Sequence, residues 1–110
     1  MAQTFSNANE ILRFANDSTI GELTEVAFAA DARSCLVQFF DSGGTVGTAG
    51  KVALVGVDGA AIGADYITVG ADATLSLTLY GDDSTEAILK IYVASSVASG
   101  IVEIVSSELP

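Results

Sequence analysis

Hydrophobic and polar residues alternate along much of this chain, which is the pattern of half-buried β-strands. The alternation is clearest in the last third, over residues 74–79, 88–93 and 101–105. Turn-rich stretches of hairpin length, 81–85 and 95–100, separate these segments. We therefore predict that the last third folds as a three-stranded antiparallel meander.

The earlier part of the chain holds further strand-like segments, at 9–15, 22–29, 34–40, 51–57 and 66–69. The compact apolar run 34–40 predicts a central strand. Asp58-Gly59 follows 51–57 and predicts a tight hairpin, because both turn positions tolerate positive φ. The segments 9–15 and 22–29 also suit a helix, but we favour strands, with Val26 and Phe28 facing inward.

About seven or eight short strands at this spacing predict an all-β protein, either an antiparallel β-sandwich or a small barrel. We expect one domain over 1–110, with residues 1–10 as an extended N-terminal arm. The glycine-rich stretch 41–50 predicts either a mobile loop or a long hairpin tip. Cys35 is the only cysteine, and its strand setting predicts a small buried hydrophobe.

Half of the 110 residues are hydrophobic, and the mean hydropathy is +0.52. Some strand positions, such as those in 52–55, are apolar on both faces. They fit burial in the core on one side and against a neighbouring molecule on the other. Dense packing of small residues in a rigid monomer is the alternative.

The charged residues and the absence of histidine narrow the function. Without histidine, Ser-His-Asp and Cys-His sites cannot form, so we expect no enzyme and no cofactor. Four basic residues against fourteen acidic ones, a net charge of −10, disfavour nucleic acid and anionic membranes as partners. No Sec-type signal opens the chain and no apolar run is long enough to span a bilayer, so we expect cytoplasmic synthesis.

Calcium is the metal that this composition would suit best, because it prefers oxygen ligands. The densest acidic cluster holds Asp82, Asp83 and Glu86. A solvated hairpin tip explains the same residues without a metal, and we favour that interpretation.

The polar start 2–7 and the closing strands 87–93 and 100–105 give a chain that resembles the small all-β decoration, or head-stabilisation, proteins of tailed bacteriophages. The resemblance implies a structural virion protein on the capsid surface, assembled in the host cytoplasm. Its partner would be the major capsid protein, and it would form a homo-oligomer, a trimer or a dimer, through apolar strand faces.

An N-terminal arm often crosses the shell in such proteins, and the resemblance implies that apolar side chains would anchor it here: Phe5, Ile11, Leu12 and Phe14. Two other functions stay open. One is a fibre, tail or surface-layer module that binds carbohydrate or protein through the glycine-rich loop 41–50. The other is a calcium-dependent binding module.

Overall fold

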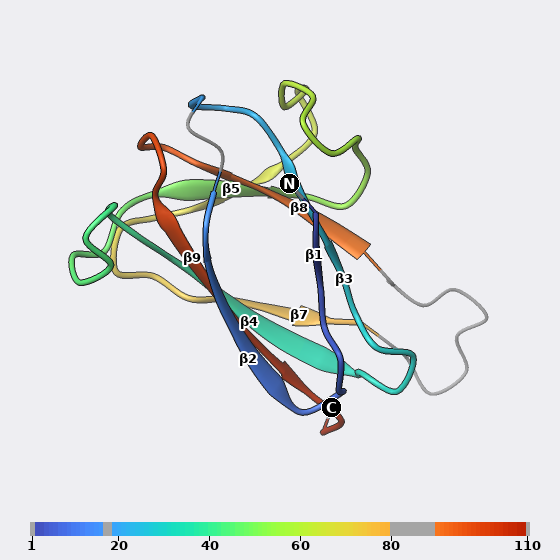
Figure 1. Ribbon diagram of the computed structural model, residues 1–110. Helices are drawn as coiled ribbons and strands as arrows, with labels where there is room; N and C mark the ends of the chain where they lie inside the picture. The colour runs from blue at the N-terminus through green and yellow to red at the C-terminus, as the bar shows by residue number, and fades with distance from the viewer. Residues whose placement is uncertain (1, 17–18, 80–89, 110) are drawn as a thin grey trace.

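Nine β-strands form the secondary structure in the computed structural model, which describes residues 2–16, 19–79 and 90–109 (Figure 1). The strands are β1 (Gln3–Thr4), β2 (Glu10–Ala15), β3 (Thr24–Ala27), β4 (Ser34–Phe40), β5 (Gly50–Ala53), β6 (Ile67–Val69), β7 (Leu75–Thr78), β8 (Lys90–Ser95) and β9 (Ile101–Ser107). The predicted all-β fold is confirmed, and both segments that also suited a helix are strands. The two-residue strand β1 was not predicted.

The strands form two sheets that pack as a β-sandwich (Figure 1). One sheet has five strands in the order β1-β3-β8-β5-β6, and the other has four in the order β2-β9-β4-β7. Neighbours pair antiparallel, except that β1 and β3 are parallel. The prediction that 34–40 is a central strand is confirmed, since β4 lies between β9 and β7.

The chain changes sheet at almost every connection. Of the eight connections between consecutive strands, only β5 to β6 joins neighbours in one sheet, and the other seven cross between sheets. The predicted C-terminal meander is therefore wrong: β8 lies in the five-stranded sheet, while β7 and β9 lie in the other. Alternation predicts which side chains face inward, but both sheets bury one face against the same core, so it does not assign a strand to a sheet.

The core lies between the two sheets, and the predicted inward positions fill it. Val26, Phe28, Val102 and Ile104 are all buried there. Cys35 is also buried, as predicted, and burial raises the pKa of its thiol to about 12. A thiol that stays protonated near neutral pH is a poor nucleophile, so Cys35 behaves as a hydrophobic residue.

The N-terminal segment is part of the sandwich, so the prediction of an extended arm over 1–10 is wrong for the described residues. β1 pairs with β3, and the Phe5 amide donates to the Ala27 carbonyl at 2.9 Å. The Phe5 ring is 3% exposed and stacks on Phe28 with 5.1 Å between ring centroids. An apolar side chain near the N-terminus could pack either on a partner protein or in the core of its own domain. Phe5 packs in the core.

β5 and β6 are antiparallel neighbours, so the predicted hairpin forms, but it does not turn tightly at Asp58-Gly59. β5 ends at Ala53 and β6 begins only at Ile67. The connection, residues 54–66, folds over the outer side of the five-stranded sheet. There it helps to bury a second, smaller cluster: Leu23, Ala53, Tyr92 and Ala94, with Ile62 packed against them. Asp58-Gly59 still makes a bend with positive φ at Gly59, but the bend lies within the loop.

The glycine-rich stretch connects β4 to β5, which lie in different sheets, but it begins as a short hairpin with an antiparallel bridge between Phe40 and Gly47. It is a folded loop rather than an open one. The Asp41 carboxylate accepts from the amides of Thr45 and Val46 at 3.3 and 3.4 Å, and the Asp41 amide donates to the Val46 carbonyl at 2.8 Å. Gly44 takes the positive φ that the turn requires.

Candidate functional site

The structure separates the four apolar side chains that the resemblance implied as anchors. Phe5 and Phe14 are core residues, and Leu12 is half-buried against the same core. Only Ile11, which is 65% exposed, points away from the sandwich, because successive residues of β2 face opposite sides. The prediction that Phe5 and Phe14 contact a partner is therefore wrong. The four residues do not form one surface.

The candidate calcium ligands Asp82, Asp83 and Glu86 lie outside the described residues. Among the residues that are described, no three cysteine, aspartate or glutamate side chains gather where they could hold a metal ion. Within the same residues, no helix is long and apolar enough to cross a membrane.

An apolar groove lies where β5 runs into the 54–66 loop and the loop returns to β6. Its volume is about 470 Å³, and it is lined by Val52, Leu54, Val55, Gly63, Ala64, Asp65, Tyr66 and Ile67. We call this the loop groove. Val55 at its rim is 87% exposed, and Val57, further along the same loop, is 68% exposed. A groove lined mostly by apolar side chains, with one of them held this far into solvent, is typical of a binding surface.

Hydrogen bonds to the chain around β3 hold the 54–66 loop in place. The Leu23 amide donates to the Ala60 carbonyl at 2.8 Å, and the Gly59 amide donates to the Leu23 carbonyl at the same distance. The Asp58 carboxylate accepts from the Glu25 amide at 2.9 Å. Gly56 allows the close approach, because a Cβ there would meet Leu23 at 2.7 Å. The groove therefore belongs to an ordered loop docked on the sheet.

Asp65 is the charged residue among those that line the loop groove. Residues 54–66 include Asp58 and Asp65 and no basic residue. The nearest positive charge that the structure shows is Lys51, whose Nζ lies 4.4 Å from the centre of the Tyr66 ring. A partner that fills this groove with an apolar side chain would gain further from basic residues at its rim.

A second exposed surface is the outward side of the four-stranded sheet, which we call the outer face. Strand register places its side chains in three rows that run across β2, β9 and β4. The two flanking rows are apolar and the middle row is polar: Ile11-Val105-Leu36, Ala15-Ile101-Phe40 and Arg13-Glu103-Gln38.

The middle row of the outer face is electrically neutral. Nε of Arg13 lies 3.2 Å from a Glu103 carboxylate oxygen, and the Arg13 guanidinium carbon lies 5.2 Å from the centre of the Phe40 ring. The guanidinium also donates to the Gly44 carbonyl, which ties the outer face to the glycine-rich loop. One positive and one negative side chain thus cancel on the outer face of a strongly acidic molecule.

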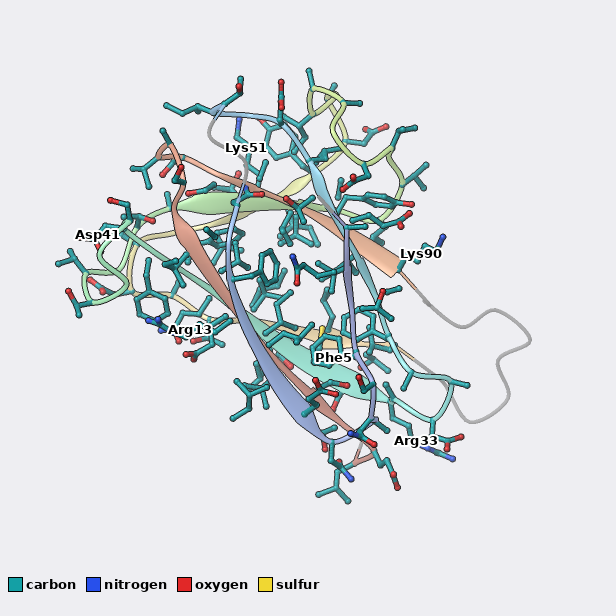
Figure 2. All side chains as sticks on the ribbon, in the orientation of Figure 1. Phe5, Arg13, Arg33, Asp41, Lys51 and Lys90 are labelled. Carbon is teal, nitrogen blue, oxygen red and sulfur yellow. The ribbon has the colours of Figure 1, made fainter. Side chains whose placement is uncertain are left out.

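The basic residues lie far apart over the rest of the surface. Figure 2 shows Arg13, Arg33, Lys51 and Lys90 at four separate places on the sandwich. Lys90 is used locally, with its Nζ 3.4 Å from a Glu25 carboxylate oxygen. No pair of these side chains forms the clustered basic patch that binding to phosphate backbones requires.

No protein-family model, no curated protein and no solved structure matches this chain. The apolar residues 52–55 were predicted to contact a neighbouring molecule, but the loop groove and the three rows of the outer face were not themselves predicted. The signal for the loop groove was the run 52–57, where apolar and small residues follow one another without the polar alternation of a half-buried strand. The signal for the outer face was the apolar identity of Ile11, Leu36 and Val105 at the solvent-facing positions of their strands.

Proposed function

We propose that this protein is a structural virion protein that binds the outside of a phage capsid and strengthens contacts between capsid subunits. The observation that supports the proposal is the loop groove, an apolar site on a loop that is docked firmly onto a rigid sandwich. A capsid protein would insert an apolar side chain between Val55 and Ile67. The sandwich would then act as a clamp, and no catalytic step is involved.

The charge of the molecule favours a protein partner. A chain of net charge −10 whose groove is lined in part by Asp65 would be attracted to a basic rim on the capsid surface and repelled by packaged nucleic acid. Binding stabilises a shell by mass action, by about 2.7 kcal/mol per occupied site when the free protein is at 100 times its Kd. Many weak contacts of this kind would resist the internal pressure of a filled head.

Binding to shells tests the proposal directly. Empty shells of the virus that encodes the chain, stripped of this protein, are mixed with the purified full chain, sedimented, and imaged by electron microscopy. We expect the chain to co-sediment and to add regular density to the outer surface. Absence of the chain from purified virions by mass spectrometry, or no binding to the stripped shells, would overturn the proposal.

Substitutions test whether the loop groove is the contact. Val55→Asp places a carboxylate at the groove rim, where it would be desolvated on binding, so we expect affinity for shells to fall at least about tenfold. Leu109→Asp is the matched control, because Leu109 is also exposed but does not line the groove. Equal binding by both variants would exclude the groove as the contact.

A further inference from the structure

We propose that two copies of this chain associate through the outer face of the four-stranded sheet, about a two-fold axis that runs between β4 and β9 and parallel to them. This inference does not depend on capsid binding, because none of the residues in the three rows of the outer face lines the loop groove. The apolar rows of the outer face lie in solvent in the single chain, where Ile11 is 65% and Leu36 44% exposed. A second copy would cover them.

Strand register makes the outer face complementary to itself. Leu36 is paired with Val105, Gln38 with Glu103 and Phe40 with Ile101 across the two central strands. A two-fold axis between these strands places β4 of one copy over β9 of the other. Each β4 residue then faces, in the second copy, the same β9 residue that it pairs with in its own sheet. On these two strands apolar side chains then meet apolar ones, and the Gln38 amide can donate to the Glu103 carboxylate of the second copy. At the two edges, β2 of each copy lies over β7 of the other. Two sheets stacked in this way pack about 10 Å apart and nearly aligned, as within a β-sandwich.

Charge decides that the occupant is a second copy. Two chains of net charge −10 repel each other, so they can approach only where the contact itself carries no net charge. The outer face meets this condition, because Arg13 and Glu103 cancel within each copy.

The size of the face sets the strength of the dimer. Four strands about 4.8 Å apart and four to seven residues long, at about 3.3 Å per residue, cover about 400 Å². A standard interface buries about 800 Å² per partner, so the outer face provides roughly half of that area. We therefore expect a weak dimer that exchanges with monomer at micromolar to millimolar concentrations.

Analytical ultracentrifugation of the full chain tests the dimer. The weight-average mass should rise from the monomer value of 11.2 kDa toward twice that value as the concentration increases from about 10 µM to about 1 mM. A mass that stays monomeric over this range would overturn the inference, and so would a stable trimer.

Two substitutions of equal charge locate the interface. Leu36→Glu adds a carboxylate next to the Glu103 of the second copy, and we expect it to weaken the dimer more than about tenfold. Val57→Glu changes the net charge by the same amount on the 54–66 loop and should shift the dimer Kd less than about twofold. Equal effects of the two variants would mean that general repulsion, rather than the outer face, controls association.

A third variant and the shell-binding assay distinguish failure of the dimer inference from failure of the capsid-binding proposal. Gln38→Glu removes the proposed donor and should also weaken the dimer, so the inference survives if Leu36→Glu fails to fold. Thermal melting of each variant shows whether it is folded. Leu36→Glu should still bind viral shells, while Val55→Asp should still dimerise. Loss of one property alone therefore shows which proposal has failed.

Discussion

Replacing Phe5 with alanine tests whether the N-terminal segment belongs to the folded domain. The Phe5 ring is 3% exposed and stacks on Phe28, and its amide is bonded to β3. Truncating a buried phenylalanine to alanine costs about 3–5 kcal/mol. We expect a value near 3 kcal/mol, because the short strand β1 can shift to fill part of the cavity. Against a total stability of about 5–15 kcal/mol, this loss is large.

Urea unfolding measures the change. With a denaturant slope of about 1.5–2 kcal/mol per M, a loss of 3 kcal/mol lowers the midpoint by about 1.5–2 M and leaves the slope unchanged. The chain has no tryptophan, so far-ultraviolet circular dichroism is the suitable signal. Val55→Ala is the matched control, because Val55 is 87% exposed and its truncation should change stability by less than about 0.5 kcal/mol.

The opposite result would support the arm that the sequence suggested. If Phe5→Ala moved the midpoint by less than about 0.3 M and abolished binding to shells, residues 1–10 would act as a docking arm in solution. The core position of Phe5 would then not describe the free protein. If Phe5→Ala lost stability while its folded fraction still bound shells, Phe5 would be a core residue and not a docking anchor.

Three further changes probe the core, the thiol and the acidic cluster. Gly50→Ala should destabilise by about 1–3 kcal/mol in urea unfolding, because the new Cβ would overlap the buried Phe39 ring. Burial raises the pKa of Cys35 from 9.0 to about 12, so the folded state keeps its proton while the unfolded state loses it above pH 9. Stability should therefore fall by about 1.6 kcal/mol more in the natural chain than in Cys35→Ala between pH 9 and 10.5, and an equal fall would show that the thiol is accessible. Calcium should not change the melting temperature, whereas a rise that Asp82→Asn with Asp83→Asn removes would establish a metal site.

The sequence pattern was sufficient to predict every strand of the described residues except β1, and in strands with one dry side it also predicted the buried face. The inward positions of β3 and β9 followed from side chains such as Val26 and Ile104, because a strand next to one core has only one dry side. The pattern could not predict strand neighbours, since β7 and β9 alternate in the same way as β8 and yet lie in the other sheet. Pairing depends on contacts between distant segments that periodicity does not record.

The candidate surfaces were harder to predict for a different reason. Val55 and Val57 continue the apolar run of β5 and suggested a buried strand, but the chain leaves the sheet after Ala53 and carries them into solvent. Phe5 suggested a binding anchor and is a core residue. Hydrophobicity predicts that a side chain seeks an apolar neighbour. The tertiary fold decides whether that neighbour lies in the same molecule.

The order of the strands has a consequence for how the protein is made. β9 is the last strand of the domain to be synthesised, yet it lies between β2 and β4 in the middle of its sheet. Until residues 101–107 are available, β2 has no neighbour in that sheet, and its apolar side chains stay exposed on the nascent chain. Folding must then join segments about ninety residues apart, which is slow compared with local pairing. The domain should therefore fold late and as one cooperative unit, and chains cut short before β9 should be cleared as unfolded protein.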